Sequence, residues 1–90
     1  IIPSRFDLSQ NYPNPFNPKT NIKIDIKETS QVKLTIYDML GREVEKLVNQ
    51  ELNAGSYNVD FTGDNYPSGV YYYTLNANNF VETKKMVLVK

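Results

Sequence analysis

Apolar and polar residues alternate with a period of two along most of the chain from Asn21 onward. The clearest runs carry a large apolar or aromatic residue at every second position: Ile22, Ile24, Ile26; Val32, Leu34, Ile36; Tyr57, Val59, Phe61. In a strand this period places one set of side chains on one face, apolar inward and polar outward. The β-branched and aromatic content favours the same assignment. The pattern therefore predicts a series of half-buried strands.

The stretch from Val70 to Leu75 is apolar or aromatic at nearly every position, and Thr74 marks one of its two faces as the more polar. We expect Tyr71, Tyr73 and Leu75 to point inward. Val70 and Tyr72 should then point outward. An outward Tyr72 beside Val70 has two interpretations, cross-strand packing on an exposed sheet or a binding patch.

Short turn segments separate the runs, and the predicted strands recur at intervals of roughly 8–12 residues, which is typical of a β-sandwich. These segments are Glu28–Ser30, Asp38–Gly41, Asn53–Gly55, Thr62–Asn65, Pro67–Gly69 and Asn76–Asn79. Asp38 and Gly41 occupy the first and last positions that a type I turn prefers. Asparagine tolerates a positive φ, so the Asn76–Asn79 segment predicts a hairpin loop.

The segment from Arg42 to Gln50 is the one ambiguous stretch, because Val44, Leu47 and Val48 have helical spacing. Its short length and the surrounding turns favour a strand with a bulge. With a short strand near Phe6–Ser9, the chain then has about seven strands. The predicted fold is all-β, a seven-stranded antiparallel Ig-like sandwich. Residues 1–10 are expected to form a linker or that short first strand, and residues 11–90 a single domain.

Three prolines within six residues make the segment Asn11–Pro18 a stiff, extended lead-in to this domain. Tyr12 and Phe16 are available to anchor it against the body of the domain. The other interpretation is a free proline-rich linker, which would rarely carry two aromatic residues.

Two segments repeat one pattern, a bulky residue, then Gly three positions later and Tyr two positions after that: Leu52–Tyr57 and Tyr66–Tyr71. Either tyrosine is a candidate for a tyrosine corner, in which the phenol bonds to backbone upstream. Coincidence is the rival explanation, because Gly commonly precedes a tyrosine in a strand.

The composition limits the classes of function that are open to this chain. Lys plus Arg and Asp plus Glu both number 10 in the 90 residues, which argues against nucleic-acid binding. The absence of Cys excludes disulfides and thiolate metal sites, and the absence of His removes the commonest general base and a hydrolytic triad within the chain. We therefore expect no catalytic residues and no cofactor.

The loop Asp60–Asn65 offers oxygen ligands but lacks the EF-hand spacing, so a bound cation is the less favoured interpretation. Because the first residue is Ile1, we expect a piece of a longer protein.

The carboxyl end, Thr83–Lys90, reads as a final strand with two basic residues before an apolar run. Its lysines either protect a sheet edge or belong to a recognition strand read by β-augmentation.

Four segments in order carry a family resemblance: Asn11–Pro18, Tyr37–Val44, Ser68–Tyr71 and Lys84–Lys90. Together they resemble the type A C-terminal sorting domain of the type IX secretion system of Bacteroidetes, over about Leu8 to Lys90. The resemblance implies an Ig-like sandwich at the end of a large exported cargo protein, with no catalytic activity of its own. The same pattern also resembles the Ig-like domain of flagellar hook-capping proteins, which supports the fold.

The resemblance further implies a route and partners. The cargo and its domain pass through the periplasm, the outer-membrane translocon reads the folded domain, and a sortase-like peptidase often removes it at the cell surface. The residues expected in translocon recognition are Ser68, Gly69, Val70, Tyr71, Lys84, Lys85, Leu88 and Lys90. The alternative function is a structural or carbohydrate-binding module of an extracellular enzyme, suggested by the seven tyrosines.

Overall fold

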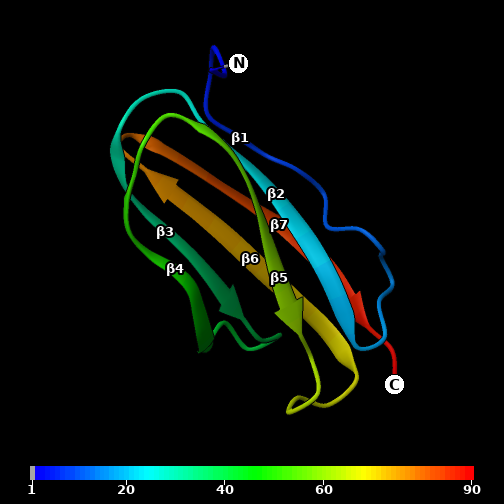
Figure 1. The fold of residues 1–90 in the computed structure, drawn as a ribbon. Coiled ribbons are helices and arrows are strands. Elements are labelled where there is room, and N and C mark those ends of the chain that lie inside the picture. The colour runs from blue at the N-terminus through cyan, green and yellow to red at the C-terminus, as the bar shows by residue number, and fades with distance from the viewer. Residues whose placement is uncertain (1) are drawn as a thin grey trace.

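The computed structural model describes residues 2–90, which form two sheets packed face to face (Figure 1). The strands are β1 (Asp7–Leu8), β2 (Lys19–Ile26), β3 (Ser30–Tyr37), β4 (Glu43–Leu52), β5 (Gly55–Thr62), β6 (Gly69–Ala77) and β7 (Phe80–Leu88). The sheet orders are β1-β2-β5 and β4-β3-β6-β7, and all strand pairs are antiparallel. The all-β, seven-stranded antiparallel sandwich is thus confirmed. Ile1 and its part of the expected linker lie outside the described residues. Over residues 2–90 no helix is present that could cross a membrane.

The core lies between the sheets and is built from the inward positions of the alternating pattern. The predicted inward residues of β2, β3 and β6 are buried: Ile22, Ile24, Ile26, Val32, Leu34, Ile36, Tyr71, Tyr73 and Leu75. In β5 Phe61 is buried, whereas Tyr57 and Val59 are partly buried because β5 is the last strand of its sheet. Tyr72 points outward and is exposed, as expected. Asn78 has φ 54° in the predicted β6–β7 hairpin.

The ambiguous segment is a strand, and two bulges explain its helical spacing. The register with β3 shifts between Leu34 and Thr35, and again between Ile36 and Tyr37. The residues of β4 left without a partner at these shifts are Leu47 and Val44. Each extra residue reverses which face the next side chain meets, so apolar residues three apart can both pack against the core.

The lead-in is anchored by one of its two aromatic residues. Phe16 is 1% exposed and lies in the core, whereas the side chain of Tyr12 is 82% exposed, so the prediction for Tyr12 was wrong. Tyr12 exchanges backbone hydrogen bonds with Asn21 at 3.0 and 2.9 Å, and this pairing fixes the alternation of the segment. Asn11, one position earlier, takes the inward place and is buried.

The lead-in also covers the outer edge of β7, the last strand of its sheet (Figure 1). The N–H of Phe16 donates to the carbonyl of Val87 at 2.9 Å, and the N–H of Val89 donates to the carbonyl of Phe16 at 3.0 Å. The Asn14 Oδ1 atom accepts from the N–H of Val87 at 3.0 Å. Over this stretch the chain itself occupies the edge, so it is closed to β-augmentation by a partner in this structure.

Candidate recognition surface

All four segments that carry the family resemblance meet at one end of the sandwich (Figure 1). There the lead-in reaches β7, and the N–H of Gly63 donates to the carbonyl of Pro18 at 2.7 Å. The last residue of the chain joins the same group, because the N–H of Lys90 donates to Ser68 Oγ at 3.0 Å. Segments that are far apart in the sequence therefore form one continuous surface.

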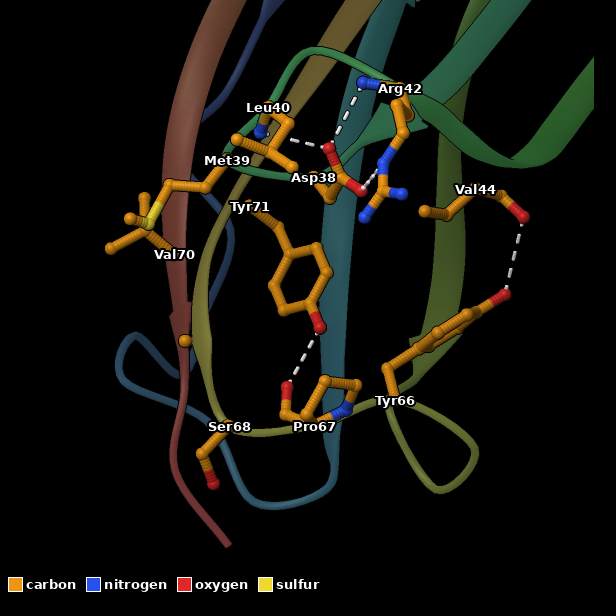
Figure 2. Close-up of a pocket in the computed structure, with 11 residues that line it drawn as sticks. Asp38, Met39, Leu40, Arg42, Val44, Tyr66, Pro67, Ser68, Val70 and Tyr71 are labelled. Atoms are coloured by element: carbon orange, nitrogen blue, oxygen red, sulfur yellow. Dashed lines mark hydrogen bonds and ion pairs between the residues drawn. The ribbon is translucent and has the colours of Figure 1, made fainter.

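An open hollow of about 340 Å³ lies on this end, between the turn that follows β3 and the loop that precedes β6 (Figure 2). It is lined by Asp38, Met39, Leu40, Arg42, Val44, Tyr66, Pro67, Ser68, Gly69, Val70 and Tyr71. A second hollow, at the opposite end, is lined by Phe6, Lys27, Glu28, Asn78, Asn79 and Phe80. None of those residues belongs to the four segments, which makes the first hollow the candidate site.

The Asp38–Gly41 turn forms one wall and is held rigidly by the Asp38 carboxylate. Its Oδ1 atom accepts from the backbone N–H groups of Leu40 at 2.9 Å and Arg42 at 3.0 Å, and Oδ2 accepts from Arg42 Nε at 2.8 Å. The backbone N–H of Arg42, together with the guanidinium, lowers the pKa of Asp38 against the opposing effect of desolvation. The predicted turn is confirmed by a bond from the N–H of Gly41 to the carbonyl of Asp38 at 3.0 Å, with φ +82° at Gly41.

Tyrosines 66 and 71 form the floor and the opposite wall. The Tyr71 hydroxyl donates to the carbonyl of Pro67 at 2.7 Å, and burial raises the pKa of Tyr71. The Tyr66 ring stacks on Phe61, with centroids 5.8 Å apart, and its hydroxyl donates to Glu45 Oε1 at 2.7 Å. Burial, followed by this bond to the carboxylate, raises the pKa of Tyr66 to about 12. Both phenols thus stay protonated and hold their positions at neutral pH.

The structure brings the first four predicted site residues together at the hollow. Ser68, Gly69 and Val70 line it at half-buried or exposed positions, whereas Tyr71 is buried and reaches it with its ring edge and hydroxyl (Figure 2). Gly69 has φ +155°, a value that L side chains rarely adopt, so glycine suits this position.

The four predicted residues of the last strand divide by exposure. Lys85 and Lys90 are exposed, and Lys90 Nζ donates to the carbonyl of Asp64 at 2.8 Å. Lys84 lies on the inner side of β7, where its Nζ is 3.2 Å from Glu82 Oε2. Leu88 is buried in the core. In the folded domain a partner can reach Lys85 and Lys90, whereas Leu88 supports the surface from beneath.

Sequence reasoning did not assign seven lining residues to the site: Asp38, Met39, Leu40, Arg42, Val44, Tyr66 and Pro67. A signal was present, because two consecutive large apolar residues in a predicted turn have no core to enter. Met39 and Leu40 are indeed 66% and 78% exposed. Exposed apolar residues grouped beside a hollow are informative in a way that single ones are not.

The acidic residues bear on the question of a bound metal ion. Over residues 2–90, no group of three or more acidic residues gathers in a way that could hold a metal ion. In the loop considered for a cation, the Asp60 carboxylate accepts instead from Asn21 Nδ2 at 3.0 Å.

Comparison with known proteins agrees with this description. A family model described as a secretion system C-terminal sorting domain matches residues 10–90. No curated protein and no solved structure matches the chain.

Proposed function

The chain belongs to the family of secretion system C-terminal sorting domains, and from this premise we propose that an outer-membrane translocon reads the folded domain at the end where the four segments meet. The domain is a sorting signal for type IX secretion, and its family is non-catalytic. It therefore interacts with the type IX secretion machinery and with a cargo polypeptide, which it directs to the cell surface or the extracellular space.

The convergence of the four segments on one surface is the observation that carries the proposal. The Asp38–Gly41 turn and the Ser68–Tyr71 segment face each other across the hollow, and Lys90 is bonded to Ser68. A partner that meets this end contacts several of the segments at once. Recognition then depends on the folded state, because folding alone brings these residues together.

We assign two different roles to the predicted recognition residues. Exposed Ser68, Lys85 and Lys90 contact the translocon, whereas buried Tyr71 and Leu88 hold the surface in place. Replacing an exposed residue then lowers export without unfolding the domain, and replacing a buried one lowers both export and stability.

We further propose passage through the periplasm and removal by a sortase-like peptidase on the amino-terminal side of Leu8. Leu8 is buried in the core, and the N–H of Ser9 bonds to the carbonyl of Lys23 at 3.0 Å. Ile2 and Arg5 precede this anchor and are exposed. The packing of Leu8 supports treating β1 as part of the same body as residues 11–90.

Export of a fluorescent cargo tests the proposal. The cargo carries a signal peptide and residues 1–90 at its carboxyl end, in a host with this pathway. We expect the unaltered fusion in the medium or at the surface, and a Lys85→Ala/Lys90→Ala fusion in the periplasm. The matched control is Lys23→Ala/Lys33→Ala, which removes two exposed lysines outside the four segments.

Retention of the unaltered fusion in the periplasm would refute the proposal as a whole. Normal export of the Lys85→Ala/Lys90→Ala fusion would refute the role given to these two lysines. Equal thermal unfolding midpoints of the two double variants are required, so that a loss of export reports recognition and not unfolding.

A further inference from the structure

The Asp38–Gly41 turn presents two largely exposed apolar side chains next to each other. Met39 and Leu40 are exposed, yet Asp38 and Gly41 fix the backbone that presents them. A rigid turn loses little conformational freedom when a partner binds it, which favours tight docking. The turn is therefore built to meet another apolar surface.

The hollow beside this turn is shaped for a side chain that comes from outside. Its lining includes the half-buried Val44 and Tyr66 and the buried Tyr71, and the two tyrosines are fixed by their hydrogen bonds (Figure 2). Its volume of about 340 Å³ is at the lower end of the range for small-ligand sites. Such a volume exceeds that of one aromatic or large aliphatic side chain, so it can hold that side chain together with part of the segment that carries it.

Arg42 adds a charged group at the rim of the hollow. Its Nε donates to Asp38 Oδ2 at 2.8 Å, but its terminal nitrogens make no hydrogen bond to any residue from 2 to 90. Figure 2 shows the guanidinium turned toward the carboxylate of Asp38, on the side of the hollow that the Asp38–Gly41 turn forms. The Asp38 carboxylate already accepts three hydrogen bonds, so the free donors of Arg42 remain for a second carboxylate.

Resting on the proposed function, we infer that the hollow binds a protein segment of the secretion machinery in which an apolar side chain lies next to a carboxylate. The apolar side chain enters between Leu40 and Tyr71, and the carboxylate accepts from the terminal nitrogens of Arg42. Apolar burial supplies most of the affinity, and the guanidinium selects for the adjacent acid. Asp38 acts as a positioning residue, since it orients Arg42 and the turn.

Titration of the 90-residue chain with two small probes tests this inference. The probes are N-acetyl-L-phenylalanine, which carries a carboxylate, and N-acetyl-L-phenylalaninamide, which does not. Amide chemical shifts are followed by NMR. We expect saturable shifts at the Asp38–Arg42 turn and at Ser68–Tyr71, with the acid binding about three- to tenfold more tightly than the amide.

Three variants distinguish the contribution of the Arg42 guanidinium to binding from that of the apolar contact with Leu40. Arg42→Gln should bind acid and amide equally, Arg42→Lys should keep part of the difference, and Leu40→Ser should weaken both probes. The controls are Arg5→Gln and Val81→Ser, which replace an exposed arginine and an exposed apolar residue outside the hollow, and both should bind like the unaltered chain. Absence of saturable shifts at the hollow, or equal binding of acid and amide by the unaltered chain, would overturn the inference.

The export assay separates this inference from the proposed function. If the unaltered fusion is exported and Arg42→Gln and Leu40→Ser fusions are exported equally well, the inference fails and the proposed function stands. If the unaltered fusion stays in the periplasm, the proposed function fails, and with it the assignment of this ligand to the secretion machinery. Selective loss of export in these two variants, with normal export of their controls, supports both.

Discussion

Tyr57 and Tyr71 make the same hydrogen bond at two places in the fold. Each phenol donates to the carbonyl of the residue four positions earlier, Asn53 at 2.5 Å and Pro67 at 2.7 Å. Between donor and acceptor lies a glycine with a large positive φ, +157° at Gly55 and +155° in the other segment. The repeat noted in the sequence therefore corresponds to the same local structure at both places.

The two bonds differ in burial, and this predicts different costs of removal. Tyr71→Phe should lower the free energy of unfolding by about 1 kcal/mol, because the carbonyl of Pro67 loses its donor at a buried tyrosine. Tyr57→Phe should cost less than about 0.5 kcal/mol, since Tyr57 is only partly buried and water can replace the phenol. Urea unfolding measures both. A cost for Tyr57→Phe equal to or above that for Tyr71→Phe would contradict this account.

Phe16 and Tyr12 provide a matched test of whether the lead-in belongs to the domain. Phe16→Ala should destabilise the domain by about 3–5 kcal/mol, because it empties a core position. Tyr12→Ala should change the stability by less than about 0.5 kcal/mol, since its side chain is in water. Chemical denaturation of both variants checks the prediction. A free linker would instead leave both variants as stable as the unaltered chain.

The sequence predicted what depends on neighbouring residues and failed where distant segments decide. Period-two alternation is a local property, so the inward sides of β2, β3 and β6 followed from it. The prediction that the Tyr12 side chain packs against the domain was wrong. The direction of this side chain depends on pairing with Asn21, nine residues away, and not on its own apolar character. The covered edge of β7 likewise depends on Phe16 meeting Leu88 across the whole chain.

The candidate site shows the same limit. Arg42 and Tyr66 lie in separate turns, and neither residue type indicates a hollow by itself. Only the register of β3 with β4 and β6 brings the two turns together. The family resemblance marked both the Ser68–Tyr71 segment and the Tyr37–Val44 segment that contains the partner turn, but only the fold shows that the two face each other across one hollow.

Gly63 and Leu88 should show strong energetic coupling. A Cβ atom at Gly63 would lie 2.6 Å from Leu88 Cδ2, which is too close. Gly63→Ala should cost about 1–3 kcal/mol through overpacking, and Leu88→Ala about 2–5 kcal/mol through a cavity. Because the second change makes room for the first, the double variant should be less destabilised than the sum, by about 0.5–3 kcal/mol.

A second pair serves as the control for this cycle. Leu75 is buried in β6. Its partner in the register is Glu82, which lies on β7 away from Leu88. Combining Gly63→Ala with Leu75→Ala should therefore be additive within about 0.5 kcal/mol. Equal coupling in both cycles would show that the steric contact with Leu88 is not the cause.

Tyr73 ties the lead-in to the core and gives the domain a predictable response to alkaline pH. Its hydroxyl donates to the carbonyl of Ser9 at 2.8 Å and accepts from the N–H of Asn11 at 2.8 Å. Burial raises the pKa of Tyr73 to about 12, and burial likewise raises the pKa of Tyr66 to about 12. In the unfolded chain a tyrosine titrates at about 10.

Between about pH 10 and about pH 12 the unfolded chain therefore loses protons that the folded domain keeps, so stability should fall as the pH rises through this window and stay level just below it. Tyr73→Phe should make that fall shallower. The same variant should be less stable by about 1–3 kcal/mol at neutral pH, because it leaves the Ser9 carbonyl and the Asn11 N–H without their partner. Urea midpoints at about pH 8 and about pH 11 measure both effects. If the alkaline slope is unchanged in Tyr73→Phe, the phenol of Tyr73 ionises in the folded domain as easily as in the unfolded chain. That result would contradict the effect assigned to its burial and to its hydrogen bond with Ser9.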